Sequence, residues 1–313
     1  MAHIIVLEKG ESRLGNKLYV FASMYAWALE RGHTIWNPSF APFAKHWPRL
    51  CDDLFISPTG PLRVGRTIAT TLRGQQAVFV VLRWIAKRGL LGPVMRPGKD
   101  SGADHVVLPP TDQGFREPTG RCLVLLRWCV RNPAGLRKHR AKIMEMFEPN
   151  EAIRADRAAF AARLGDRDRL RVGVHVRHTD YRNHMGGICY IPMEQFLAEM
   201  RRVQERFKAR RPIFAVFSDE PRRAEEFEGM EVVISNGSAI EDIHRMSALD
   251  VMMGPLSTFA LWGMYSGGGV VYDFANHAAN PAIGWITDGM DAAHSLDALA
   301  AWLERPREVP RVA

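Results

Sequence analysis

Short apolar runs alternate with helix-like patterns along this chain, and the alternation predicts its fold. Near the N-terminus an apolar run at 3–7 precedes a glycine-containing loop, and apolar residues then recur at helical spacing from Leu18 to Leu29. Gly32 is expected to end this helix, and Asn16 is expected to cap its start. With a further strand beginning at Thr34, the opening is typical of a Rossmann-like unit, although it lacks the G-x-G-x-x-G phosphate loop.

The second half of the chain alternates more regularly. Strands are expected at 171–176, 213–217, 231–234, 251–253 and 270–273, and helices at 193–208, 222–227, 239–248 and 258–265. Strict alternation of this kind is typical of a parallel, doubly wound sheet. Because ligands bind beyond the carboxyl ends of such strands, chemistry is expected in the loops after Val176, Phe217, Ile234 and Met253.

The middle of the chain sets the predicted domain boundary. Pro and Gly interrupt the region from about 50 to 120, which is expected to be a loop-and-helix insertion, and a helix is expected at 134–147. The polar stretch 163–169 then separates the two halves. We therefore expect an α/β protein with an N-terminal Rossmann-like domain at 1–168 and a C-terminal Rossmann-like domain at 169–313 that ends in a helix.

Composition agrees with a folded enzyme or binding protein. The chain has 313 residues, of which 47% are hydrophobic and 24% charged, as expected for two soluble domains. None of the four cysteines forms a C-x-x-C pair, which argues against a zinc ribbon or a redox motif and favours buried thiols. The N-terminal apolar run is too short for a signal peptide or a membrane span, so a cytoplasmic location is expected.

The net charge of +8 is concentrated in one segment. Between Leu54 and Lys99 there are eight Lys and Arg and no Asp or Glu, so this segment accounts for the whole excess. Two interpretations stay open. In the first, residues 62–96 contact an anionic membrane surface or an anionic acceptor, and the protein would lie peripherally at the inner membrane face. In the second, they form a helical insertion whose basic side chains face water. A nucleic-acid partner is not expected.

Polar residues with a chemical use follow several of the predicted strands. Arg177 offers a planar, permanently charged fork for phosphate oxygens, and Asp180 is close enough in sequence to orient it or simply to pair with it. Ser257 and Thr258 stand at a helix start, where free amides suit a pyrophosphate and where capping is the plainer explanation. Asp219 belongs to a polar cluster that is usually only a helix cap.

A further carboxylate, Asp242, stands at the beginning of its helix. Its oxygens could accept from the N1 and N2 donors of guanine, or it could be an ordinary acid at a helix terminus.

Four sequence blocks, in order, resemble a known superfamily. The segment at 12–18 is similar to the Gly-x-Leu-Gly-Asn-Gln segment of α1,2-fucosyltransferases and to the related segment of protein O-fucosyltransferases. His175-Val-Arg-His-Thr-Asp180 resembles the His-x-Arg-Arg-x-Asp signature shared with α1,6-fucosyltransferases. Two further segments resemble the third block of the superfamily. They are Asp242-Ile-His with Ser247, and the segment from Ser257 to Trp262.

The resemblance implies a GT-B glycosyltransferase with two Rossmann-like domains facing a central cleft, a GDP-fucose donor, no metal or other cofactor, and inversion at the anomeric carbon. Carried over by position, it implies that Arg177 binds the donor β-phosphate, with His175 near the nucleotide and Asp242 on guanine. It further implies that Asn16 approaches the sugar and that Ser257 and Thr258 support the phosphates. Asp219 and Phe259 are further candidates for donor binding.

Departures from the family pattern leave the donor sugar and the base open. Lys17 replaces the usual Gln, and His178 replaces the second Arg. No Glu follows soon after Asp180, so Asp180 and His184 are the remaining candidates for the base. Asp166-Arg-Asp168 fits a metal-binding Asp-x-Asp pattern, but it precedes a strand and is expected to be a solvated hinge.

The expected function is transfer of fucose from GDP-fucose to a glycan or glycolipid hydroxyl. The alternatives are a transferase that uses another GDP-sugar and a catalytically silent GDP-sugar-binding module. Acceptor, linkage and oligomeric state are not predicted.

Overall fold

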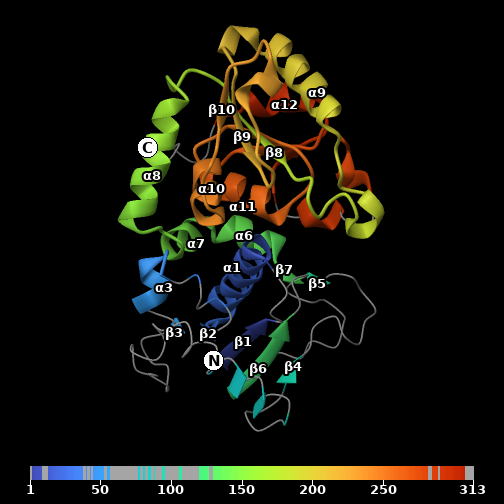
Figure 1. The fold of residues 1–313 in the computed structure, drawn as a ribbon. Helices are drawn as coiled ribbons and strands as arrows, with labels where there is room; N and C mark the ends of the chain where they lie inside the picture. The colour runs from blue at the N-terminus through green and yellow to red at the C-terminus, as the bar shows by residue number, and fades with distance from the viewer. Residues whose placement is uncertain are drawn as a thin grey trace. The chain divides into compact units, whose positions relative to one another are not determined.

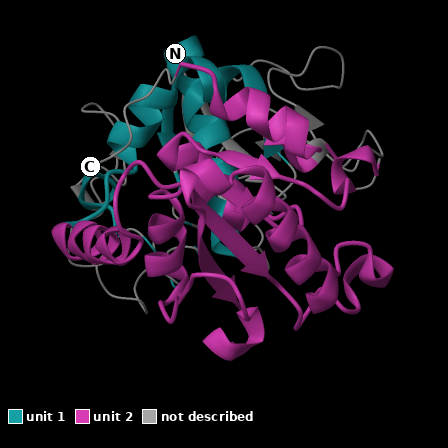
Figure 2. Ribbon diagram, turned by 90° about the horizontal axis from the view of Figure 1, so that it is seen from above, with its two compact units in different colours: residues 1–150 teal, residues 151–313 magenta. Residues whose placement is uncertain are grey.

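The computed structural model describes residues 2–8, 13–37, 40, 43, 45–52, 55–56, 77, 80–81, 84–85, 88, 94–95, 106–107, 120–126, 130–280, 284–287 and 290–306. The chain divides into two compact units, residues 1–150 and 151–313 (Figure 2). The predicted insertion at 50–120 lies mostly outside the described residues, as do Ser12 of the first family block and the side chains of Cys51, Cys122 and Cys129.

The first unit is built on a mainly parallel sheet with the strand order β3-β2-β1-β6-β4. Its strands are β1 (Ala2–Glu8), β2 (Thr34–Trp36), β3 (Phe55–Ile56), β4 (Val94–Met95) and β6 (Gly120–Leu126). Only β3 among them pairs antiparallel, with β2. A second small parallel sheet joins β5 (Val106–Val107) and β7 (Val130–Arg131).

The helix α1 (Leu14–Arg31) is buried along most of its length. Gly32 ends it in the left-handed conformation, with φ of 63°, as expected from the sequence. The expectation that Asn16 caps its start is wrong, because the helix begins at Leu14 and Arg13 is the N-cap. Leu14 and Gly15 are buried, so packing extends the helix beyond the polar residue that the sequence offers as a cap.

The helix expected at 134–147 is two shorter helices, α6 (Pro133–Lys138) and α7 (Arg140–Met146). His139 separates them with φ of −105° and ψ of 15°, outside the helical range. Asn132 caps α6 by accepting a hydrogen bond from the amide of Gly135 at 2.9 Å. A short helix, α3 (Pro48–Asp52), also belongs to this unit.

The second unit contains a six-stranded sheet in the order β10-β9-β8-β11-β12-β13, and all of its pairings are parallel. The strands are β8 (Arg171–Val176), β9 (Ile213–Ser218), β10 (Val232–Ile234), β11 (Val251–Met253), β12 (Val270–Tyr272) and β13 (Ala292–Ala293). The predicted α/β class with parallel, Rossmann-like sheets is therefore confirmed for the units themselves.

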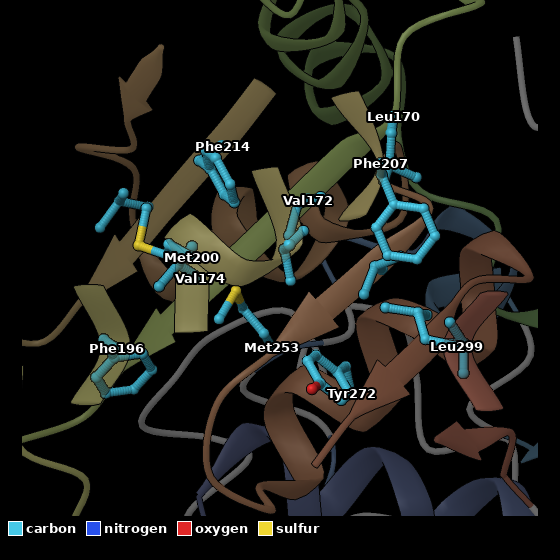
Figure 3. Close-up of a cluster of buried hydrophobic side chains, with 14 of the residues drawn as sticks. Leu170, Val172, Val174, Phe196, Met200, Phe207, Phe214, Met253, Tyr272 and Leu299 are labelled. Carbon is cyan, nitrogen blue, oxygen red and sulfur yellow. The ribbon is translucent and has the colours of Figure 1, made fainter. Parts of the chain in front are cut away.

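Helices cover both faces of this sheet (Figure 1). They are α8 (Glu151–Arg163), α9 (Met193–Arg206), α10 (Ala239–Met246), α11 (Thr258–Gly267) and α12 (Leu296–Leu303). On one face α9 and α12 pack against alternate residues of the strands, and this is the main core (Figure 3). On the other face Phe160 of α8 contacts Phe217, with ring centroids 5.8 Å apart. No helix among the described residues is long and apolar enough to cross a membrane.

Two predictions for this unit need correction. The helix expected at 222–227 is a short 3₁₀ turn, η4 (Ala224–Phe227). The division between the units falls before α8, whereas the sequence placed the boundary after it, at 168. The guanidinium of Arg245 on α10 donates two hydrogen bonds to Asp156 of α8, at 2.8 and 2.6 Å, and so ties this helix to the second unit.

Candidate functional site

Polar side chains gather where the parallel strands of the second unit end. Arg177 follows β8, Asp219 follows β9 and Ser235 follows β10, while Gly254 follows β11. Since the strands run in the same direction, these positions share one edge of the sheet. Asp166 and Asp168 lie before β8, at the opposite edge, where Asp168 pairs with Arg211.

Arg177 is held in one orientation by two neighbours. Its Nε and Nη2 atoms donate to the two oxygens of Asp180 at 2.8 and 2.7 Å, which is the bidentate geometry of a strong ion pair. Its guanidinium also lies over the ring of Tyr181, 4.3 Å from the centroid. The Arg177 side chain is only 16% exposed. Asp180 uses two of the five N–H groups, which leaves three for other acceptors.

Tyr181 connects Arg177 to the start of α11. Its hydroxyl donates to the carbonyl of Leu256 at 3.3 Å, directly before Ser257. Ser257 is the N-cap of α11, and its hydroxyl accepts from the amide of Phe259 at 3.3 Å. The predicted residues Arg177 and Ser257 are thus brought together beside the amide end of a ten-residue helix, with Thr258 as its first residue.

His175 lies buried beneath this group. Its ring packs near that of Phe259, with centroids 6.0 Å apart, and its Nδ1 atom is buried without a hydrogen-bond partner. Burial, followed by the charge of Arg177, lowers the pKa of His175 to about 4, so the imidazole is neutral at physiological pH. A neutral ring adds no second positive charge next to Arg177.

Asp219 accepts hydrogen bonds from the loop that follows β8. One oxygen accepts from the amide of His178 at 2.9 Å, and the other accepts from the amide and hydroxyl of Thr179. Burial alone would raise its pKa, but these hydrogen bonds hold the pKa of Asp219 below its usual value. Its predicted donor-binding role stays a prediction, and the contacts observed are those of a residue that shapes the loop.

Asp242 lies in the first turn of α10, beside the end of β10. The hydroxyl of Ser235 donates to its Oδ1 at 2.5 Å, and Nη1 of Arg245 lies 3.5 Å from the same oxygen. Burial raises the pKa of Asp242 to about 6 in spite of these partners. This carboxylate therefore has a raised pKa and lies at the carboxyl ends of the strands, where functional residues of such sheets concentrate.

The remaining predicted residues are less well defined. Asn16 is half-buried in the first turn of α1, in the first unit, and its role toward the sugar stays a prediction. Both oxygens of Asp180 face Arg177, an arrangement that suits orientation of the guanidinium better than proton abstraction. His184 is exposed and stacks on Tyr181 with ring centroids 5.9 Å apart, so it stays a candidate base.

Sequence reasoning gave no role to Tyr181, Ser235 or Arg222. Tyr181 and Ser235 each lie just past a strand end, so position relative to the strands could have suggested them. Arg222 contacts residues far from it in sequence, and no local signal marks it. Within the part of the chain that the structure describes, no three His, Cys, Asp or Glu side chains are arranged to hold a metal ion.

Comparison with known families gives a match that lies mostly in the second half of the chain. The model described as glycosyl transferase family 11 matches residues 139–282, a stretch that includes β8 to α11 and every candidate residue of the second unit. The match confirms, over this stretch, the predicted resemblance to the fucosyltransferase superfamily. Comparison with curated protein sequences gives no match.

Solved structures give distant likenesses. One is fucosyltransferase NodZ from Bradyrhizobium, with 13% identity, coverage of 84% of this chain and 93% of that chain, and a TM-score of 0.48. Another is POFUT1 in complex with GDP, with 13% identity, coverage of 86% and 95%, and a TM-score of 0.46. Likenesses this distant carry no argument about function.

Proposed function

We propose that this protein transfers a sugar, fucose, from GDP-fucose to a hydroxyl group of a glycan or glycolipid. The observation that carries the proposal is the placement of Arg177 next to the start of α11, inside the stretch that matches the glycosyltransferase family. A fixed cation and a helix amide end together make a site for a diphosphate. The wider architecture we propose is GT-B, with the donor on the second unit and the acceptor on the first.

The proposed chemistry follows the growth of negative charge on the leaving group. The acceptor oxygen forms a bond to the anomeric carbon while the bond from that carbon to the β-phosphate oxygen breaks, and GDP departs with the electron pair. Arg177 and the amides at the start of α11 stabilise the charge that develops on the phosphate. The acceptor proton passes to a base, for which Asp180 and His184 are the candidates, or to the departing diphosphate.

Asp242 is the residue we assign to the guanine base. Its Oδ1 is engaged by Ser235 and Arg245, so Oδ2 is the oxygen that we assign to the N1 and N2 donors of guanine. Uracil cannot donate in the same way. His175, neutral and buried beside Phe259, is proposed to line the nucleotide site.

Inversion at the anomeric carbon and independence of metal are also parts of the proposal. The first rests on the resemblance to the family. The second is supported by Arg177 and the start of α11, which can supply the positive potential that a metal gives in other transferases. Asp166 and Asp168 belong to the opposite edge of the sheet and suit no donor-site metal.

A donor panel tests the proposal. The melting temperature is measured with GDP-fucose, GDP-mannose, UDP-sugars, GDP and UDP, and release of GDP from GDP-fucose is followed separately. Stabilisation by GDP-fucose and GDP, with slow release of GDP, is the expected result. Turnover of GDP-mannose in place of GDP-fucose would favour the alternative donor, and binding without turnover would favour a silent binding module. Equal shifts with GDP and UDP would contradict the guanine assignment.

We further propose a cytoplasmic protein that contacts the anionic membrane surface through part of segment 62–96. Residues 77, 80, 81, 84 and 85 are helical, and the side chains of Val80, Val81 and Trp84 are 62, 53 and 52% exposed. Arg88 lies over the Trp84 ring, 3.7 Å from its centroid. Helical spacing places these residues on one face, and the basic charge of the segment suits anionic lipid headgroups.

Vesicle sedimentation tests this contact. The protein is expected to bind vesicles containing phosphatidylglycerol and not pure phosphatidylcholine, and added salt should weaken binding. Trp84→Ser and Arg88→Glu should each weaken it, while Arg201→Glu, an equal charge change at an exposed position of α9, should not. A loss with Arg201→Glu as large as that with Arg88→Glu would show that net charge alone attracts the protein.

A further inference from the structure

Both ring nitrogens of His178 make hydrogen bonds, and the partners fix the tautomer of the ring. Nε2 lies 2.8 Å from the carbonyl oxygen of Ile191, and Nδ1 lies 2.9 Å from Nη2 of Arg222. A carbonyl oxygen only accepts, and a guanidinium only donates. Nε2 therefore carries the proton and Nδ1 accepts, so the ring is neutral with a single tautomer. His178 is 3% exposed, which protects both bonds from exchange with water.

Arg222 is held by other residues as well as by His178. Its Nη2 donates to Glu220 at 3.0 Å, its Nη1 to Glu226 at 3.2 Å, and its Nε to the hydroxyl of Ser218 at 3.3 Å. The Arg222 side chain is only 10% exposed. These contacts keep the guanidinium on the loop after β9, so it presents a fixed donor to His178.

The other groups around the His178 ring add no competing acceptor at Nε2. Glu220 lies 3.5 Å from Nδ1 and is itself bound by Arg222, with Arg182 3.9 Å from its other oxygen. The rings of Tyr190 and Phe196 pack on the imidazole, with centroids 4.9 and 6.4 Å away. The backbone amide of His178 is bound by Asp219.

The loop that carries Arg177 is thus tied at three points. Asp219 holds the backbone at 178 and 179, Arg222 holds the side chain at 178, and His178 reaches Ile191 just before α9. Arg177 is the residue directly before this anchor. The direction of the Arg177 side chain toward the start of α11 therefore depends on how the loop leaves β8.

We infer that Arg222 is a positioning residue of the donor site and that it acts through neutral His178 to fix the loop that presents Arg177. The inference rests on the proposed function of Arg177. It also explains the departure from the family pattern at position 178. At this position the family pattern has an arginine. This chain has His178 instead, and its imidazole links the loop after β8 to Arg222 in the loop after β9. Arg222 is engaged by two carboxylates and a serine, so it holds the loop rather than the phosphate.

Paired substitutions separate hydrogen bonding from shape. His178→Gln keeps an acceptor for Arg222 and a donor for Ile191, whereas His178→Leu fills similar space and keeps neither. Arg222→Met removes the donor, and Arg201→Met on the exposed face of α9 is the matched control. The readouts are amide hydrogen exchange at 177–191 without ligand, GDP affinity, and kcat and KM for GDP-fucose.

His178→Leu and Arg222→Met are expected to speed exchange at 177–191 and to lower kcat by roughly ten- to a hundredfold, the effect of losing one hydrogen bond to a charged group. His178→Gln and Arg201→Met should stay near wild type. The double variant of His178→Leu and Arg222→Met should be no worse than either single variant, because both remove the same link. Equal damage from Gln and Leu at 178, or unchanged exchange in Arg222→Met, would overturn the inference.

The exchange measurement keeps this inference separate from the proposed function. A wild-type protein that neither binds GDP nor turns over GDP-fucose would end the proposed function. The comparison of exchange rates would still decide whether Arg222 fixes the loop through His178.

Discussion

Replacement of Arg177 is the most direct test of the proposed mechanism. The side chain places a fixed positive charge beside the start of α11 and donates to both oxygens of Asp180 at 2.8 and 2.7 Å. In the proposed reaction, negative charge on the β-phosphate grows as the bond to the sugar breaks. Arg177 should therefore stabilise the transition state more than the bound donor. Arg177→Ala is expected to lower kcat more than it weakens GDP binding.

The expected magnitudes can be compared. Loss of one such electrostatic donor typically costs about 2.7–4 kcal/mol of transition-state stabilisation, or roughly a hundred- to thousandfold in rate. The ion pair with Asp180 is partly exposed, with side chains 16 and 33% accessible, so its loss should cost about 1–3 kcal/mol of folding free energy. A protein of ordinary stability, about 5–15 kcal/mol, survives that loss. The rate should therefore fall far more than the loss of folding stability, measured as a lower melting temperature, can explain.

The assay measures GDP release from GDP-fucose, GDP affinity by calorimetry, and the melting temperature for Arg177→Ala and Arg177→Lys. Lysine should rescue only part of the rate because it lacks the two-pronged fork. Arg202→Ala is the control, since Arg202 also pairs with a carboxylate three residues away, Glu199, but on α9. A folded Arg177→Ala protein that turns over at near the wild-type rate would refute the reasoning.

Three further outcomes are expected. Asp242→Asn should remove the preference for GDP over UDP. Because burial raises the pKa of Asp242 from 3.8 to about 6, folding stability falls by about 3 kcal/mol as pH rises through this range, so the variant should gain melting temperature at pH 8 and only about half as much at pH 5. Activity should persist in excess EDTA, and loss of turnover that Mn²⁺ restores would show a metal requirement. Gly254→Ala should lower the melting temperature and the nucleotide affinity, because the added Cβ would lie 2.6 Å from the carbonyl oxygen of His175. Gly229→Ala is the control, since Gly229 also has positive φ but has open space around it, and its effect should be much milder. Equal effects would show that backbone conformation alone matters.

The sequence predicted strands better than helix ends, for a physical reason. The bounds of β8 and β11 agree with prediction because short apolar runs of buried strands stop abruptly at polar residues. Helix starts depend on which neighbouring residues packing can recruit. Asn16 is a good capping residue, yet the burial of Leu14 and Gly15 began α1 earlier. The break at His139 likewise follows no strong local signal.

The candidate site divides in the same way. The pairing of Arg177 with Asp180 could be predicted because the two residues are three apart, and the Ser257 cap because serine commonly begins a helix. The contacts of Asp242 with Ser235 and of Arg222 with His178 join separate loops. Such contacts depend on how the strands align in the sheet, which one sequence does not specify.

The contact between α8 and α10 connects the proposed guanine-binding residue to the first helix of the second unit. Arg245 binds Asp156 on the first helix after the division and also lies beside Asp242. A ligand that alters the charge or partners of Asp242 therefore alters the energy of the contact that holds this helix. Coupling between two binding events is reciprocal, so a ligand whose affinity depends on the position of α8 would change nucleotide affinity at the proposed site by the same factor as the nucleotide changes its own. The first helix of the second unit is thus held by the same arginine that lies beside the proposed guanine-binding residue.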